Sequence, residues 1–361
     1  LSLELAPGDD GLSVEISTRA MSTIGPISAG LDGLGATLDL AVSPDADAGT
    51  SLDVALRLPD GVAVAVESGP VSGAGFLKRF PDEGRYAGGA TLTIPPVGLT
   101  AFGLIDTQLP DGTTGFSFLL FVAGRFAPIP LGFGFNLTSV GGLVGLHRDV
   151  DTDALFAAVR TGAARRLLAP EDPVGDAAEL TRDAQAIFPV TRGQHIFGPT
   201  AQITWGTPKA LVTLDLALAL TLPDPLRLIF IATVASDLPD ARAAIVSIRV
   251  DAAGVLDFTN SRFDMQGRVY DSHVQGIPLS GGFAVRSGWG AAPELAFSVG
   301  GLHPNFEPPA NFPSLERMAI DLSRGSAFRL RIEGYFAITS NSLQLGAALD
   351  FAAESGGFGV Y

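Results

Sequence analysis

The chain has 361 residues, of which 47% are hydrophobic and 17% are charged, and this composition excludes a disordered chain. The formal net charge of −15 at pH 7 opposes attraction to phosphate backbones, so we expect no nucleic-acid partner. The absence of cysteine excludes disulfides and thiolate chemistry, and it leaves both a reducing compartment and an extracellular location open.

Up to about residue 148 the chain alternates apolar and polar residues with a period of two. Because successive side chains of a strand point to opposite faces, this alternation predicts strands with one apolar face. Pro59-Asp60-Gly61 separates two such segments, 52–58 and 62–66. Asp-Gly favours the positive φ angles of a tight connection, so these two segments are predicted to form a hairpin.

The segment from Gly112 to Leu146 contains one charged residue, Arg125, and must be tested as a membrane span. Two prolines and many glycines interrupt it, and its phenylalanines lie at even spacing. These features indicate buried strands instead of a spanning helix. A transmembrane barrel is an open alternative, although two Trp and four Tyr are few for aromatic girdles.

Residues 149–190 are the one interval with a helical pattern. Asp151 is placed to cap a helix that Pro170 would end. A second helix is predicted from Asp176 up to Pro189. We expect this two-helix insertion to cover one face of a sheet as a plug or lid.

The clearest alternation lies between Leu211 and Pro223. Its apolar members are Val212, Leu214, Leu216, Leu218, Leu220 and Leu222. The residues between them are Thr, Asp and Ala, so an extended strand would carry a continuous apolar ribbon on one face. Similar patterns recur at 262–270 and 328–351. We expect these ribbons to share one water-free side, as in antiparallel sheets with one apolar and one wet face.

The predicted fold class is therefore all-β and mainly antiparallel. The architecture is expected to be an extended or curled large sheet, barrel-like or sandwich, with a short two-helix insertion. The predicted organisation is an N-terminal β unit at 1–148, a helical insertion at 149–190 and a C-terminal β unit at 191–361. The second β unit is expected to continue the first and to be part of a longer protein. Ser-Val-Gly-Gly-Leu occurs at both 139–143 and 298–302, which hints at a duplication.

Alternate aspartates from Asp149 to Asp153 have the spacing of a calcium loop. Ala154 and Arg160 stand where that loop requires glycine and a bidentate glutamate, so helix capping is favoured. Asp45 and Asp47 fail the same template.

The histidines are His147, His195, His273 and His303, and no two have the spacing of metal ligands. His147 and His303 are predicted to cap strand ends, and the alternative is that these two face each other across a pocket. His195 follows the helical interval and is the polar residue of most interest.

No nucleophile elbow and no phosphate-binding loop occurs in the sequence. Asp321 and Glu333 could stand opposite each other, but chance explains such a pair in a sheet. Trp205 and Trp289 are each followed by glycine and are predicted to anchor strand ends. No catalytic, metal-binding or cofactor-binding residue, and no cofactor, is predicted.

Several motifs occur in an order that resembles a known family. They are PLGFGFNLT at 130–138, VGGLVGL at 140–146, VDTDAL at 150–155, PEDPV at 170–174, HIFGP at 195–199 and WGTP at 205–208. Over roughly Phe116 to Tyr361 the chain resembles a family of large, mostly bacterial, β-rich proteins catalogued only as a domain of unknown function. The resemblance implies further strands of the same kind after Tyr361, and it carries over no catalytic residue.

The leading functional hypothesis is a non-enzymatic structural or interaction module of a large bacterial multidomain protein. Its partners would be other domains of the same polypeptide or an assembly partner. The alternative is binding or transfer of an apolar ligand, such as a lipid, through a hydrophobic groove or barrel. A hydrolase with an unrecognised site near His195 is the third hypothesis. What covers the apolar sheet face separates the first two.

Overall fold

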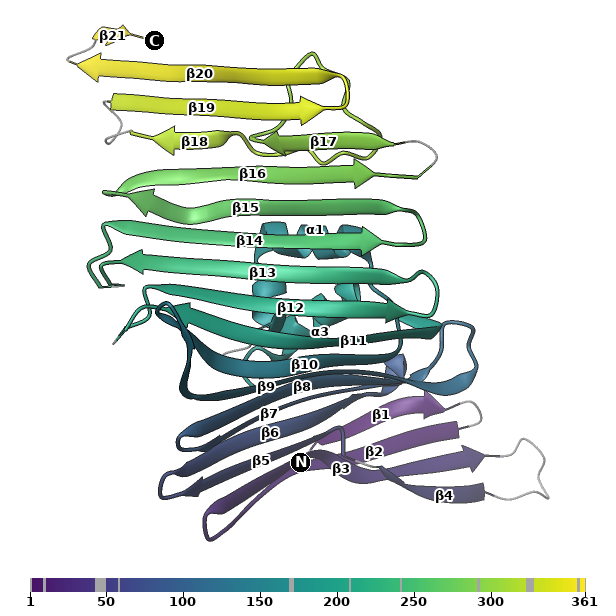
Figure 1. Cartoon of the computed structure of the whole chain (residues 1–361). Coiled ribbons are helices and arrows are strands. Elements are labelled where there is room, and N and C mark those ends of the chain that lie inside the picture. Colours follow the sequence, from purple (N-terminus) through teal and green to yellow (C-terminus); the bar gives the residue numbers. More distant parts are fainter. Residues whose placement is uncertain are drawn as a thin grey trace. The chain divides into compact units, whose positions relative to one another are not determined.

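The structure is a computed structural model that describes residues 2–8, 11–42, 50–57, 59–168, 172–207, 209–240, 242–290, 293–322, 328–355 and 358–360. Strands account for 68% of the chain and helices for 9%, which confirms the predicted all-β antiparallel class (Figure 1).

The chain forms two compact units. The first comprises Leu1–Phe118 and Asp172–Ala178, and the second comprises Leu119–Glu171 and Glu179–Tyr361. Strand β9 (Thr114–Gly132) begins in the first unit and continues into the second. The other strands of the first unit are β1 (Ser2–Gly8), β2 (Gly11–Ile24), β3 (Ile27–Val42), β4 (Thr50–Arg57), β5 (Gly61–Ser68), β6 (Val71–Phe80), β7 (Arg85–Ile94) and β8 (Val97–Gln108), with a short 3₁₀ helix, η1, at Pro81–Glu83.

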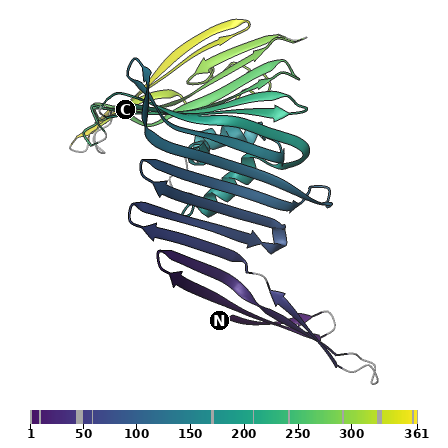
Figure 2. The ribbon, with the colours of Figure 1, turned by 60° about the horizontal axis from the view of Figure 1, so that its bottom comes forward.

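In the first unit β5 to β8 pair in chain order as antiparallel neighbours (Figure 2). The hairpin predicted at Pro59-Asp60-Gly61 is wrong, because β4 and β5 both pair with β3, over 35–42 and 27–32 respectively. The Asp60 backbone N–H donates to the Asp32 carbonyl oxygen at 2.8 Å, beside Gly33 at φ +78°. The chain therefore does not reverse direction at Asp60-Gly61. It passes through a bulge there and continues to pair with β3, first as β4 and then as β5.

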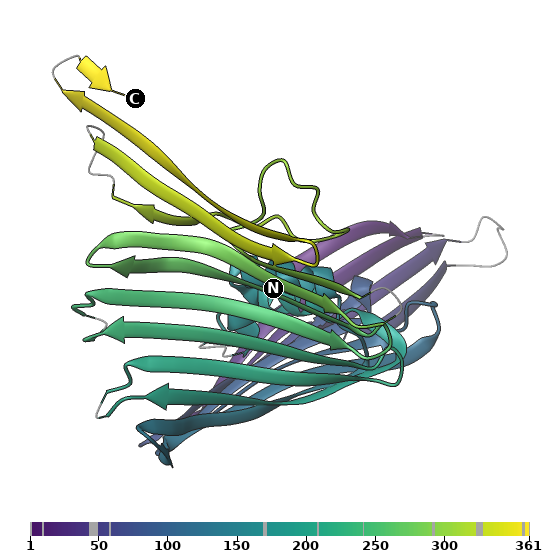
Figure 3. The ribbon, with the colours of Figure 1, turned by 45° about the horizontal axis from the view of Figure 1, so that its top comes forward.

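The second unit contains the remaining elements. Its helices are α1 (Thr152–Thr161), α2 (Ala163–Leu168) and α3 (Ala177–Ile187), the last of which begins in the first unit's segment. Its strands are β10 (Phe135–Arg148), β11 (Val190–Trp205), β12 (Val212–Leu222), β13 (Arg227–Leu238), β14 (Val246–Asp257), β15 (Arg262–Val274), β16 (Ile277–Gly288), β17 (Glu294–Val299), β18 (Met318–Asp321), β19 (Phe328–Thr339), β20 (Ser342–Ser355) and β21 (Phe358–Val360). Strands β10 to β17 pair antiparallel in chain order (Figure 3).

The helical interval begins where the sequence predicts it. The Asp151 carboxylate accepts from the backbone N–H groups of Asp153 and Ala154 at 3.0 and 2.9 Å, which confirms it as an N-cap. The first predicted helix is divided into α1 and α2 because Gly162 adopts φ +79° and ends α1 with a left-handed cap. In its described residues the insertion consequently has three helices, where the sequence predicts two.

The register assigns side chains of the second unit to two faces, because directly paired residues share a face. Apart from Ile231, one row carries small or polar residues; it consists of Ala217, Ile231, Ala253, Gln266, Ala284, Ser298 and Ala337. We call the face with this row the helix face. The helical interval packs on it, with α1 against β14 and β15 and α2 against β12. In Figure 1 the helices accordingly lie behind these strands.

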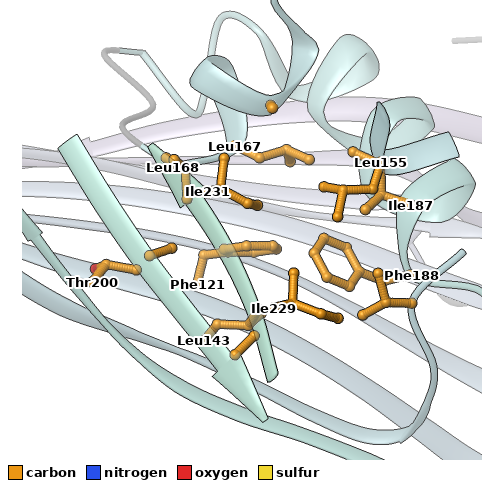
Figure 4. A pocket seen from close by; sticks show the side chains of 14 residues that line it. Phe121, Leu143, Leu155, Leu167, Leu168, Ile187, Phe188, Thr200, Ile229 and Ile231 are labelled. Atoms are coloured by element: carbon orange, nitrogen blue, oxygen red, sulfur yellow. The ribbon is translucent and has the colours of Figure 1, made fainter. Parts of the chain in front are cut away.

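The core of the second unit lies between the helix face and the helical interval. Sheet side chains of Phe121, Leu143, Ile229 and Ile231 point toward Leu155, Leu167, Leu168, Ile187 and Phe188, as Figure 4 shows. The remaining cavity is about 20 Å³, which is little more than one water-sized probe, so the helices fill this face as a core. The predicted covering of one sheet face by the helices is found here.

A loop covers the same face further along the sheet. Residues 300–317, between β17 and β18, bring Phe312 against Ala284 and Ala296. Arg286 fixes the loop by donating to the backbone carbonyl oxygens of Ala310 and Asn311, the latter at 2.9 Å. Among the described residues, both covering elements therefore lie on the helix face.

One expectation is overturned by this arrangement. The strand at 212–222 forms, but its leucine ribbon points away from the helices and is not the water-free side. Ala217 and Ala219, the small residues between the leucines, are 4% and 5% exposed, whereas Leu218 is 46% exposed. The helices need small side chains beneath them in order to approach the sheet closely, and alanine and glycine provide that space.

Candidate functional site

The candidate site is the face of the second unit's sheet opposite the helices, which we call the apolar face. Its first central row is Leu218, Phe230, Gly254, Met265, Val285, Phe297, Ile338 and Leu343. Its second is Leu216, Ala232, Ala252, Gly267, Phe283, Val299, Phe336 and Leu345. Neither row contains a polar side chain.

Each central row crosses eight strands, β12–β17, β19 and β20. At a strand spacing of about 4.8 Å the rows extend for roughly 34 Å. One leaflet of a bilayer holds acyl chains within roughly 15 Å of hydrocarbon, half of the usual core thickness. The apolar face is therefore long enough for acyl chains in more than one position.

The large side chains on this face are accessible to solvent. Leu345, Leu343 and Leu349 are 72%, 65% and 65% exposed, and none of the large side chains in the two central rows belongs to the buried core. Exposed apolar residues scattered singly are ordinary, but a contiguous apolar surface marks an interaction site.

Aromatic rings give the apolar face low relief. A Cβ atom placed on Gly254 would lie 2.1 Å from the Phe230 ring, and one placed on Gly267 would lie 2.2 Å from the Phe283 ring. Each ring thus lies over the glycine of the neighbouring strand and shields its backbone. Because the rings cover the glycine backbones, the centre of the face presents hydrocarbon instead of exposed peptide groups.

The charged residues of the same strands lie on the helix face. Asp264 and Arg286 pair there at 2.7 Å. Asp215 accepts hydrogen bonds from Gln202 at 2.8 Å and from Thr233 at 3.3 Å. Sequence alternation therefore places these polar networks on the helix face, beside the core, and leaves the two central rows of the uncovered face without a polar side chain.

One polar cluster lies beneath α2 and contains Asp251, Tyr270 and Arg165. The Tyr270 hydroxyl donates to Asp251 at 3.1 Å, and the Arg268 guanidinium stands 4.6 Å from the Tyr270 ring. Burial raises the pKa of Asp251, although Tyr270, Arg165 and Arg268 oppose the shift. Burial likewise raises the pKa of Tyr270. For Arg165, burial lowers the pKa and the hydrogen bond to Tyr270 raises it, and the net pKa is raised. The cluster joins α2 to the sheet, and it does not line the small cavity between the helices and the sheet.

Two of the histidines, His147 and His195, lie side by side, and they are not the pair of His147 and His303 that the sequence suggests as an alternative. His147 lies beside His195 with ring centroids 5.4 Å apart, whereas His303 packs against Tyr335. The Nδ1 atom of His147 accepts from the Gly193 backbone N–H at 2.8 Å. His147 and His195 thus bind backbone groups where β10 ends and β11 begins, which for His147 agrees with the predicted capping of a strand end. His273 contacts the Ala244 carbonyl oxygen at 3.3 Å.

The acidic candidates have structural partners. Asp149 pairs with Arg227, and its Oδ1 atom accepts from the Val150 backbone N–H at 2.8 Å. Asp321 lies opposite Arg331, and Glu333 accepts from that arginine at 2.7 Å. Asp45 and Asp47 lie outside the described residues. No group of three or more metal-ligating side chains occurs in the part of the chain that the structure describes.

Both tryptophans stand where strands end. Trp205 is the last residue of β11, and Trp289 directly follows β16. None of the helices that the structure describes has the length and apolar content to cross a membrane.

The sequence pattern identified the apolar-face residues of β12, β15, β19 and β20 but misjudged their environment. The signal that could have shown it lies in the intervening positions of 212–222 and 246–257. In 212–222 the positions between the leucines are Thr, Asp and Ala, and at 252–254 of the second segment all residues are Ala or Gly, so small side chains on the covered side allow a helix to pack closely.

Comparison with known proteins gives a family without an activity. No curated protein matches the chain. No solved structure matches it either. A family described as "Family of unknown function (DUF6603)" matches residues 1–361, so the match includes the first hundred residues, where the sequence motifs are fewer. The chain therefore belongs to the DUF6603 family of unknown function.

Proposed function

We propose that this chain is a non-enzymatic β module whose apolar face binds the acyl chains of lipids. The observation that supports the proposal is the choice of covered face. Three helices and the 300–317 loop pack on the helix face, which carries alanines and charged residues, while the more apolar face has no cover among the described residues. A sheet that leaves its hydrocarbon side in water is expected to bind an apolar partner.

The chemistry of the face favours acyl chains over a protein surface. Protein interfaces combine an apolar centre with hydrogen bonds, at about one bond per 100–200 Å². The central rows offer no side chain that can donate or accept a hydrogen bond. A hydrocarbon chain needs none, and its binding free energy grows by about 0.8 kcal/mol for each CH₂ group that is buried.

Photolabelling tests the proposal at residue resolution. The purified chain is incubated with a fatty acid that carries a diazirine near its methyl end, irradiated and analysed by peptide mass spectrometry. Adducts are expected on alternate residues, on Leu216 and Leu218 but not on Ala217 and Ala219. Adducts without this alternation, or an equal yield from heat-denatured protein, would contradict the proposal.

A matched pair of variants on β20 tests the same face by affinity. Leu345 belongs to the apolar face, and Ala348, also exposed, belongs to the opposite face of the same strand. Leu345→Lys is expected to weaken fatty-acid binding about tenfold, because it removes buried apolar area from the complex. Ala348→Lys adds the same charge and should leave the affinity unchanged. Equal losses in both variants would indicate an effect of charge instead of a binding face.

The second candidate function is a structural module whose apolar face packs against another protein surface or another domain of the same polypeptide. The same uncovered face supports it, because facing sheets pack about 10 Å apart through apolar side chains. Native mass spectrometry of the purified chain separates the candidates. Co-purified acyl chains support lipid binding, whereas a lipid-free dimer whose interface is formed by Leu343 and Leu345 supports the structural module.

A further inference from the structure

The hairpin between β9 and β10 has an apolar tip, which we define as residues 129–135 together with Trp205. Phe133 is 98% exposed, more than any other large apolar side chain in the described part of the chain. Ile129, Leu131 and Phe135 are 50%, 53% and 46% exposed. No Asp, Glu, Lys or Arg occurs between Arg125 and Arg148, so the tip carries no charged group of its own.

The backbone holds Phe133 in this position. Gly132, Phe133 and Gly134 have φ angles of +102°, +51° and +83°. A non-glycine residue in the left-handed region is strained, and such strain is usually retained for a function. The Trp205 indole N–H donates to the Phe133 carbonyl oxygen at 3.1 Å, and its ring lies against Gly134. The exposed phenylalanine therefore stands on a fixed turn.

We propose that this tip inserts Phe133 into the interfacial region of a membrane of zwitterionic lipid. Phenylalanine and tryptophan are the side chains that favour the boundary between headgroups and acyl chains, the ring in hydrocarbon and the indole N–H near water. The net charge of −15 opposes an anionic surface, which leaves a neutral one.

The position of the tip fits this role. Phe135 pairs with Trp205, and Trp205 pairs with Val212 at the end of the leucine ribbon. The tip is thus continuous with the apolar face, at the strand ends where β11 stops and β12 begins. The inference goes beyond acyl-chain binding, and membrane insertion can be tested without a lipid on the apolar face.

The two tryptophans permit a site-specific test. Trp289→Phe leaves Trp205 as the single indole of the chain. Mixing this variant with phosphatidylcholine vesicles is expected to shift the Trp205 emission to shorter wavelength. Vesicles with brominated acyl chains should quench that emission. An unchanged emission and no quenching would overturn the proposal.

Variants of the tip give the second measurement. Phe133→Ser in the Trp289→Phe protein is expected to lower vesicle partition at least tenfold, since the phenyl ring supplies most of the inserted apolar area. Phe133→Leu should retain most of the partition. Phe258→Ser is the control, because Phe258 is 47% exposed in the turn after β14 and lies outside the tip. Equal partition of the Phe133→Ser and Phe258→Ser proteins would overturn the inference.

Self-association is the competing explanation for an exposed tip. Light scattering without vesicles shows whether the chain forms dimers that Phe133→Ser dissociates, and that result would assign the tip to a second copy. Failure of the vesicle experiment leaves the photolabelling of Leu216 and Leu218 unaffected, so the two proposals fail separately. A Leu345→Lys protein that loses fatty acid but still partitions through Trp205 would retain the membrane tip alone.

Discussion

At the scale of single residues, the cluster of Asp251, Tyr270 and Arg165 shows how the helical interval is joined to the sheet. Asp251 is 1% exposed, and its Oδ2 atom has no hydrogen-bond partner among the described residues. Its Oδ1 atom accepts from Tyr270 at 3.1 Å. A buried carboxylate with one oxygen unsatisfied destabilises the fold when ionised, so the remaining donor matters.

The sign of this effect follows from linkage. Burial raises the pKa of Asp251 above its ordinary value, so the folded chain holds this proton over a pH interval in which the unfolded chain has lost it. The contribution of Asp251 to the free energy of unfolding therefore falls as pH rises from its unfolded pKa, about 3.9, through its folded pKa.

Tyr270→Phe removes the hydroxyl that opposes this shift. We expect the variant to lower the free energy of unfolding by about 1–3 kcal/mol at pH 7 and by less at pH 4. Urea denaturation of both proteins at the two pH values measures the difference. In an Asp251→Asn background the effect of Tyr270→Phe should no longer depend on pH. A loss that is equal at pH 4 and pH 7 in the native background would contradict this account.

At the scale of the strand, the apolar face depends on aromatic residues that lie over glycines of the next strand. Phe230 on β13 lies over Gly254 on β14, and Phe283 on β16 lies over Gly267 on β15. The glycine gives room for the ring, and the ring shields a backbone that has no side chain of its own. The two residues therefore act as a pair.

A double-mutant cycle tests this pairing. Phe230→Ala and Gly254→Ala should each lower the free energy of unfolding, the first by loss of packing and the second by displacing the ring. The double variant should be more stable than the sum of the two losses predicts, by about 1 kcal/mol, because alanine at 254 no longer meets a ring. Chemical denaturation of the four proteins gives the coupling. Simple additivity would show that the ring and the glycine do not interact.

At the scale of the whole molecule, a large negative charge accompanies an uncovered apolar face. The net charge of −15 makes copies of the chain repel one another, which opposes contact between their apolar faces. Added salt screens that repulsion, with a Debye length of about 10 Å at 0.1 M and about 3 Å at 1 M.

This balance predicts how the delipidated chain behaves in solution. It should stay dispersed at low ionic strength and associate as the salt concentration rises toward 1 M. Saturation with oleate should suppress the association at every salt concentration, because the fatty acid occupies the surface that would make the contact. Size-exclusion chromatography with light scattering measures both states. Association that is indifferent to oleate would show that the contact lies elsewhere.

The sequence alone determined which segments become strands and which residues share a face. The alternation at 212–222 places Leu214, Leu216 and Leu218 together in any extended chain, since a period of two follows from backbone geometry. The Asp151 cap was equally local, because a side chain meets backbone N–H groups two and three residues away. For the same reason the apolar-face residues of β12, β15, β19 and β20 could be named in advance.

Only the tertiary structure decided which face is covered and which backbone conformation the glycine-containing motifs adopt. Ser-Val-Gly-Gly-Leu is continuous strand at 139–143, but at 298–302 its glycines turn at φ +75° and +86°. Glycine permits both conformations, so long-range pairing selects one. Asp60-Gly61 likewise forms a bulge instead of a hairpin turn, because the Asp60 backbone N–H donates to the carbonyl oxygen of Asp32, 28 residues away. The helices pack on the side that carries Ala217 and Ala219, because small side chains allow a helix to approach a sheet closely, and the leucine side has no cover among the described residues.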